Sequence, residues 1–225
     1  MPRGRGRADA QFSTACRECP RLSGFLDTVR RAHPGYFARP VPPFGAAQPR
    51  LLIVGLAPGM HGANRSGRPF TGDFAGILLY QTLFKFGFAS RAESVATDDG
   101  LVLTGCRITN AVKCLPPENK PATVEIRQCN HYLKAELGAL ASGSAVLALG
   151  AIAHQAVLLA LGGKRSRFPF AHAAVHDLPA GLTLFDSYHC SRYNTQTRRL
   201  TKDMFNQVFT DIVQYLSKIR PKPLP

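Results

Sequence analysis

The pattern of apolar positions predicts strands and helices that alternate along most of the chain. Compact apolar runs, typical of strands buried on both faces of a sheet, occur in the regions 51–54, 102–112, 145–150 and 182–185. Apolar residues at helical spacing predict helices at 21–32, 74–87, 123–139, 151–161 and 201–219. Strands that alternate with helices form a parallel sheet covered on both faces. We therefore expect one α/β domain.

Polar residues follow three of the predicted strands. The first strand leads into a glycine-rich loop, 55–72, and the second ends at Thr109-Asn110. The fourth runs into Tyr188-His189-Cys190-Ser191. In an open parallel sheet, ligands bind beyond the carboxyl ends of the strands. A glycine-lined wall, Asn110 and His189 are therefore expected to converge on one pocket.

Each of these features alone also has an ordinary structural explanation. The loop lacks the G-x-G-x-x-G and G-K-[ST] patterns of nucleotide-binding loops, so a plain strand-to-helix connector would explain it. Asn110 alone is typical of a turn, and His189 alone is typical of a hydrogen-bonded structural histidine. Asp73, directly before a predicted helix, is well placed to be its N-cap. Their shared position at strand ends is what favours a functional site.

Composition adds a polyanionic partner to this picture. The chain of 225 residues carries 28 Lys and Arg against 14 Asp and Glu, a formal net charge of +14. Such an excess is typical of proteins that bind nucleic acid or an anionic membrane, although a basic surface without a partner is the alternative. Residues 1–10 are expected to be a flexible basic tail of the single domain 1–225. The tail is not followed by the apolar core of a signal peptide, which favours a cytoplasmic protein.

Four of the six cysteines have a spacing that suits a metal centre. Cys16 and Cys19 form a C-x₂-C pair, and Cys114 and Cys129 are separated by about the length of a helix. Four thiolates can hold zinc or an iron–sulfur cluster, and a reducing cytosol keeps thiols free for that purpose. A disulfide or ordinary buried thiols remain the alternative. Of the others, Cys106 lies in an apolar run, and Cys190 is either close to the site or a small filler.

Taken together, these motifs resemble a known family. The segments Gly55-Leu56-Ala57-Pro58-Gly59 to Thr71-Gly72-Asp73, Thr109 to Cys114, and His189-Cys190-Ser191 with Asn194-Thr195 resemble the uracil-DNA glycosylase superfamily, and family 5 within it. The resemblance implies an α/β/α sandwich around a four-stranded parallel sheet, with a 4Fe–4S cluster on the four cysteines. It also implies excision of deaminated bases from DNA, which we expect to be double-stranded or single-stranded. No lysine lies in an obvious nucleophilic motif, so we expect a monofunctional enzyme, and we expect it to be a monomer. Uracil, hypoxanthine and xanthine are the implied bases.

The resemblance also implies a role for each candidate residue. His189 would donate to uracil O2, Asn110 would pair with the polar edge of the base, and Phe70 would stack on it. Ala57 replaces the water-positioning Asp or Asn of many relatives, which suggests Asp73 as a compensating acid. Residues that would line the base pocket are Gly55, Leu56, Ala57 and Gly59, and residues that would contact DNA are Ser191, Arg192, Tyr193, Arg198 and Arg199.

Two other classes of function compete with this reading. A non-catalytic nucleic-acid-binding protein with a structural metal cluster would explain the charge and the cysteines. It would leave Asn110 and His189 at the strand ends unexplained. A membrane-surface protein ranks last, because no strongly amphipathic basic helix stands out.

Overall fold

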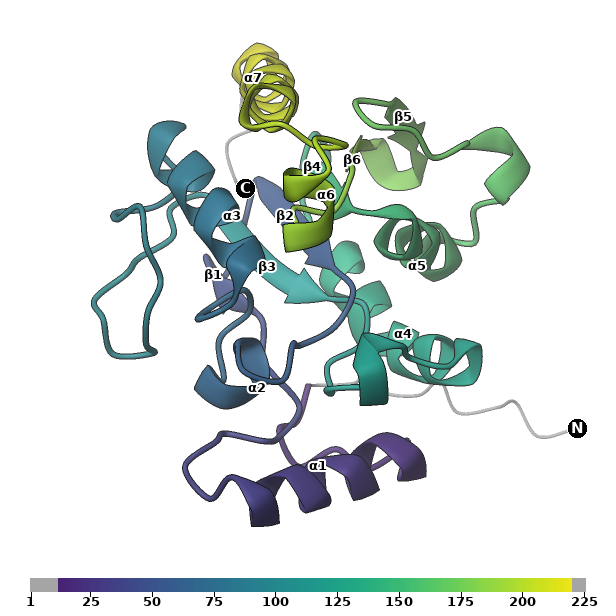
Figure 1. The fold of residues 1–225 in the computed structure, drawn as a ribbon. Coiled ribbons are helices and arrows are strands. Elements are labelled where there is room, and N and C mark those ends of the chain that lie inside the picture. Colours follow the sequence, from purple (N-terminus) through teal and green to yellow (C-terminus); the bar gives the residue numbers. More distant parts are fainter. Residues whose placement is uncertain (1–11, 220–225) are drawn as a thin grey trace, which may run out of the picture.

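The central sheet contains the four predicted strands, all parallel to one another (Figure 1). The structure, a computed structural model, describes residues 12–219, so the expected basic tail lies outside it. The parallel strands lie in the order β3 (Cys106–Asn110), β2 (Leu51–Gly55), β4 (Ala145–Leu149) and β6 (Leu182–Ser187). Almost every residue in them is buried, which explains their continuous apolar runs.

The sheet has six strands, so the prediction of a four-stranded sheet was incomplete. β1 (Phe44–Gly45) adds antiparallel to β3 at one edge, and β5 (Val175–Leu178) adds antiparallel to β6 at the other. β1 is only two residues long, and β5 is half exposed, with His and Asp at its centre. Neither edge strand carries the apolar run that marks a buried strand, because each packs at the border of the sheet.

Helices cover both faces of this sheet, which gives the expected α/β/α layers (Figure 1). Along β2, Leu51 and Ile53 face the layer of α3 and α7, whereas Leu52 and Val54 face α4 and α5. The long helices begin and end within two residues of the predicted bounds. The helices are α1 (Pro20–Ala32), α2 (Ala63–Ser66), α3 (Phe74–Lys85), α4 (Thr123–Gly138), α5 (Ala151–Leu161), α6 (Arg192–Gln196) and α7 (Lys202–Lys218). Within residues 12–219, no helix combines the length and apolar character needed to cross a bilayer.

The N-terminal helix α1 packs beside the sheet against a separate apolar cluster. Leu22, Leu26 and Val29 of α1 contact residues of the segment after β3 and of α4, including Val112 and Tyr132. Pro20 occupies the first turn of α1 directly after Cys19, where its missing N–H has no intrahelical partner to lose. The cluster ties the beginning of the described chain to its middle.

A buried ion pair fastens the loop between β2 and α3. Nη1 of Arg68 lies 2.8 Å from Oδ1 of Asp99, and the two side chains are 5% and 7% exposed. Burial opposes the ionisation of Asp99, but Arg68 and three backbone N–H groups outweigh it and hold the pKa of this carboxyl well below its usual range. The hydroxyl of Tyr80 donates to the carbonyl of Pro69 at 2.8 Å. These bonds hold Arg68 and the next residue, Pro69, in place.

We expect Asp99→Asn to destabilise the protein, because it leaves the Arg68 guanidinium buried without a counter-charge. Breaking a buried pair in this way costs about 3–5 kcal/mol, measurable by urea unfolding at neutral pH. Since folding lowers the pKa of Asp99, its contribution is present above about pH 3.9 and is lost as the pH falls further. The difference from the wild type should therefore shrink in acid. The exposed neighbour Asp98, changed to Asn, is the control and should unfold like the wild type.

Candidate active site

A cavity of about 250 Å³ opens at the carboxyl ends of β2 and β3. Strand-end topology therefore gave the correct place for a pocket. Of the predicted site residues, Gly55 lies behind the cavity rather than on its wall, and those on the wall are Leu56, Ala57, Gly59, Phe70, Asp73, Asn110, His189 and Ser191.

Phe70 forms one wall in a backbone conformation that aromatic residues seldom adopt. Its φ is 56°, in the left-handed region, where a bulky side chain is strained. Two glycines make room for it. A Cβ on Gly55 would lie 2.7 Å from the Phe70 ring, and a Cβ on Gly76 would lie 1.8 Å from the Phe70 carbonyl oxygen. Neither position can carry a side chain while Phe70 keeps this place.

Asn110, the last residue of β3, presents an unsatisfied acceptor. The side chain is buried, and its Oδ1 has no hydrogen-bond partner among residues 12–219. A Cβ on Gly55 would approach this oxygen to 2.5 Å, so Gly55 also makes room for Asn110. Because an unpaired buried acceptor costs about 1–3 kcal/mol, its place on the wall of an open cavity indicates a ligand that donates a hydrogen bond.

His189 lies on the cavity wall beside Phe70. The two rings are stacked, with centroids 6.0 Å apart and an interplanar angle of 30°. Nδ2 of Asn194 donates to the carbonyl of His189 at 2.8 Å, and Ser191 caps α6. The loop that carries His189 is therefore held by α6. Burial lowers the pKa of His189 to about 4. The imidazole is therefore neutral at physiological pH.

Asp73 caps α3 and reaches the same cavity. Its Oδ1 accepts a hydrogen bond from the backbone N–H of Gly76 at 2.8 Å, as the sequence predicted for an N-cap. Oδ2 lies against Gly62, where a Cβ would come within 2.7 Å. Burial raises the pKa of Asp73, and the backbone N–H groups of Gly76 and Ala75 oppose that rise only in part. One oxygen thus serves the helix while the carboxyl also lines the pocket.

The predicted DNA-contact residues lie in α6 and on either side of it. Ser191 lines the cavity, and the other four are exposed. Tyr193 is 71% exposed. The Arg192 guanidinium lies 5.8 Å from the centroid of the Phe74 ring, and that of Arg199 lies 4.6 Å from the centroid of Tyr188. Arg198 is exposed in a left-handed conformation, with φ 58°. Exposed cations and aromatic rings therefore lie together around α6.

Three residues on the wall were not predicted from the sequence: Ala63, Ala75 and Asn119. The two alanines lie in α2 and α3, within segments read only as loop or helix. Asn119 reaches the cavity from an irregular turn in which Glu118 and Asn119 both have positive φ. A Pro-Pro-Glu-Asn turn was the one available signal, since Asn tolerates the left-handed region.

The four predicted cysteine ligands line one further cavity, between α1, α4 and the loop after β3. All four are free thiols, and the backbone N–H of Lys113 donates to Sγ of Cys129 at 3.4 Å. Burial, followed by the charge of Cys129, raises the pKa of Cys19 to about 11. Assembling four thiolates here is therefore unfavourable unless a cation compensates them. Of the remaining cysteines, Cys106 and Cys190 are both buried in the main core.

Comparison with known proteins agrees with this geometry. The family model described as the uracil DNA glycosylase superfamily matches residues 42–213, a span that contains all of the residues lining the strand-end cavity. A type-5 uracil-DNA glycosylase of Thermus thermophilus is 48% identical over 91% of this chain and 95% of its own length. Type-5 enzymes of Mycobacterium leprae and Pyrobaculum aerophilum are 44% and 41% identical, over 90% and 86% of this chain and 92% and 85% of their own lengths. The chain therefore belongs to the uracil-DNA glycosylase superfamily, with type-5 relatives that match it over most of its length.

Proposed function

We propose that this protein is a type-5 uracil-DNA glycosylase, which hydrolyses the N-glycosidic bond of uracil in DNA and leaves an abasic site for base excision repair. The family membership and the type-5 relatives support this activity. The observation that carries it at the level of the site is Asn110, which lines a cavity together with His189 and whose buried Oδ1 has no hydrogen-bond partner among residues 12–219. A non-catalytic DNA-binding protein would have no use for such an arrangement.

The cavity explains how uracil is recognised once it leaves the duplex. A base inside the stack is out of reach, so it must be flipped into the pocket at a cost of a few kcal/mol. Phe70 offers a flat apolar face to the flipped base, and Oδ1 of Asn110 accepts the N3–H of uracil. Cytosine has an acceptor at N3, which would meet Oδ1 acceptor to acceptor. The buried oxygen thus selects uracil over cytosine.

His189 stabilises the departing base. As the glycosidic bond breaks, negative charge develops on the uracil ring, and a hydrogen bond to O2 strengthens. A neutral imidazole can donate this hydrogen bond through its single N–H. Burial lowers the pKa of His189 and so keeps it neutral. The role assigned to His189 is therefore electrostatic stabilisation of an anionic leaving group.

Asp73 is the group we assign to water activation. Ala57 cannot polarise a water molecule, whereas Asp73 lines the same cavity from the start of α3. A raised pKa makes its carboxylate a stronger base than an exposed aspartate. Oδ2 is the oxygen free for this task, since Oδ1 accepts the capping bond from Gly76.

The range of excised bases extends, in this proposal, to hypoxanthine and xanthine. Both purines present an N–H beside a carbonyl, the same pattern that uracil offers to Asn110. Small residues on the wall, Ala57, Gly59, Ala63 and Ala75, leave room for a larger ring. Recognition thus rests on an edge that all three bases share.

DNA binding is assigned to the exposed residues around α6 and to the net charge of +14. Arg192, Arg198 and Arg199 would hold phosphates beside Ser191, which lines the cavity. The exposed Tyr193 would enter the space left by the flipped base. Since phosphate contacts release counterions, binding to double-stranded or single-stranded DNA should weaken steeply with salt. The protein would act as a monomer, and its free thiols suit a reducing compartment such as the cytoplasm.

The four-cysteine cavity is proposed to hold a 4Fe–4S cluster. Cys16, Cys19, Cys114 and Cys129 converge there as free thiols. A single zinc ion would draw four sulfurs to about 3.8 Å from one another, given Zn–S bonds of about 2.3 Å. Among residues 12–219, no three of these four sulfurs all lie within 4.8 Å of one another. The one group that meets this criterion consists of other residues. This wider spacing supports a cluster. Its role would be to tie α1 to the loop after β3.

We expect Asn110→Ala and His189→Ala to bind DNA like the wild type and to lose about 10²–10³ in single-turnover excision rate. The assay is alkali cleavage of a uracil-containing oligonucleotide. Asn206→Ala is the matched control, because Asn206 is another buried Asn with an unpartnered Oδ1, located in α7 away from the cavity. Wild-type rates in His189→Ala would refute the assigned mechanism.

The pH dependence of the wild-type rate tests the state of His189. An ordinary histidine would become charged near pH 6.5, whereas the pKa of His189 is about 4. The rate contribution of His189 should therefore stay constant from about pH 8 to about pH 6 and fall only in stronger acid. An inflection near pH 6.5 that disappears in His189→Gln would show that the imidazole titrates normally.

Asp73→Asn separates the two roles of Asp73. Asn retains most of the capping ability, and losing a cap costs only about 1 kcal/mol. Removing a water-activating carboxylate should lower the single-turnover rate by about 10²–10⁴. We therefore expect a large rate loss with a nearly unchanged melting temperature. Full activity together with a lowered melting temperature would assign Asp73 to the helix cap alone.

Purified protein should be brown, with broad absorption near about 400 nm from thiolate-bound iron. Cys114→Ser should lose that absorption and the associated iron. Cys106→Ser, at a buried cysteine outside the cage, is the control and should keep both. A colourless wild type with one zinc per chain would replace the cluster by a zinc site.

A further inference from the structure

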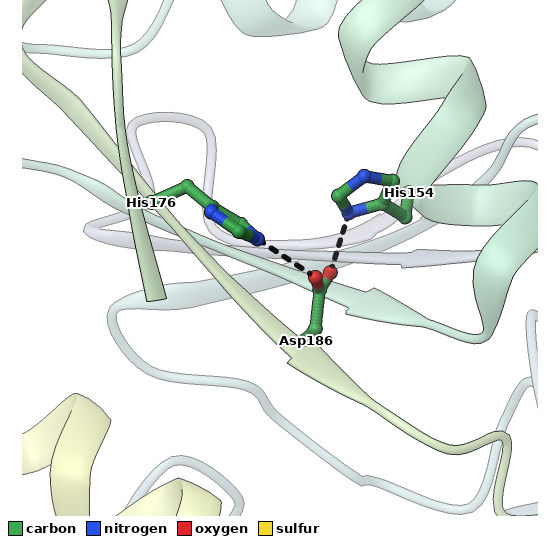
Figure 2. A group of neighbouring side chains, drawn as sticks. All are labelled: His154, His176 and Asp186. Carbon is green, nitrogen blue, oxygen red and sulfur yellow. Dashed lines mark hydrogen bonds and ion pairs between the residues drawn. The ribbon is translucent and has the colours of Figure 1, made fainter. Parts of the chain in front are cut away.

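A second group of metal-ligand side chains lies near the β5 edge of the sheet, whereas the cysteine cavity lies beside α4 and the loop after β3, toward the other edge. Figure 2 shows His154 of α5 and His176 of β5 pointing toward the carboxylate of Asp186 in β6. The three ligand atoms all lie within 4.8 Å of one another, and no other such group occurs in residues 12–219. The sequence gives no hint of it, since the three residues belong to no motif.

The charge of Asp186 has no ordinary partner. The side chain is fully buried, and the described residues place no Lys or Arg within ion-pair distance of it. Each oxygen instead faces an imidazole. Oδ1 lies 2.8 Å from Nδ1 of His154, and Oδ2 lies 3.2 Å from Nε2 of His176. A carboxylate buried this deeply requires a compensating positive charge.

The second nitrogen of His154 shows where that charge belongs. Nε2 lies 2.9 Å from the carbonyl oxygen of Phe168, and because a carbonyl only accepts, this nitrogen carries the hydrogen. In a neutral imidazole, Nδ1 then has a lone pair that faces a carboxylate oxygen, acceptor against acceptor. A metal ion bound by both atoms, to one side of the line that joins them, would remove this conflict. Histidines that bind metals typically donate their other N–H to a backbone carbonyl in this way.

We propose that His154, His176 and Asp186 bind a divalent transition ion of the zinc type. Two imidazoles and one carboxylate are a ligand set that zinc accepts, with a water molecule in the fourth position. The side chain of His176 is 11% exposed, so the group can be reached from the surface. The site would join α5, β5 and β6. It would thereby brace the strand that ends two residues before His189.

The test compares zinc content between matched variants of the full chain. Wild type and His176→Gln are equilibrated with zinc, freed of excess by gel filtration and measured by elemental mass spectrometry. Because only the difference is used, whatever occupies the four cysteines cancels. Gln can still donate to Asp186, so the variant should fold, as circular dichroism will verify. His154→Gln is a second variant from a different element, and His33→Gln is the control for unspecific imidazole binding.

We expect the wild type and His33→Gln to hold one equivalent more than either ligand variant. Zinc should also raise the melting temperature of the wild type but not of His176→Gln. With cobalt as probe, the difference spectrum should show visible bands without sulfur-to-cobalt charge transfer. Equal zinc content in all variants, or the same loss in His33→Gln, would overturn the proposal.

Discussion

The shape of the strand-end cavity depends on a glycine, Gly55, at the end of β2. Gly55 pairs in register with Asn110 on the neighbouring strand, and a Cβ at this point would collide with both Asn110 and the ring of Phe70. The polar group and the aromatic wall can therefore lie against the same strand end. Phe70 in turn keeps its strained backbone because Gly76 leaves room for its carbonyl. The position of Phe70 thus depends on two glycines, Gly55 in β2 beside its ring and Gly76 in α3 beside its carbonyl.

Buried ion pairs hold the backbone on both sides of this arrangement. Arg68 and Asp99 fix the loop that carries Phe70. After β3, the ammonium of Lys113 is buried and lies 2.5 Å from the carboxylate of Glu136 in α4. Lys113 stands between Asn110, which lines the pocket, and Cys114, which lines the cysteine cavity. A short segment held by this ion pair therefore connects the strand-end cavity to the cysteine cavity.

The sequence predicted the elements that carry an apolar pattern of their own. Continuous apolar runs and helical spacing located the four parallel strands and five long helices. β1 and β5 escaped because a border strand is held by its neighbour rather than by an apolar run of its own. For the pocket, the rule that strand ends converge was enough for Asn110 and His189. Asn119 was missed because its turn, with two left-handed residues, follows from local backbone geometry, which spacing does not encode.

Desolvation gives the two ionisable groups of the pocket complementary properties. Burial disfavours charge on any group, so it raises the pKa of Asp73 and lowers that of His189. The first shift strengthens a base, and the second keeps an imidazole neutral so that it can donate a hydrogen bond without becoming a cation. An exposed pair would hold a weaker base beside a partly charged histidine at neutral pH. In the proposed mechanism, the apolar walls made by Phe70, Ala57 and Leu56 therefore do more than receive the base. They also set the protonation states on which the chemistry depends.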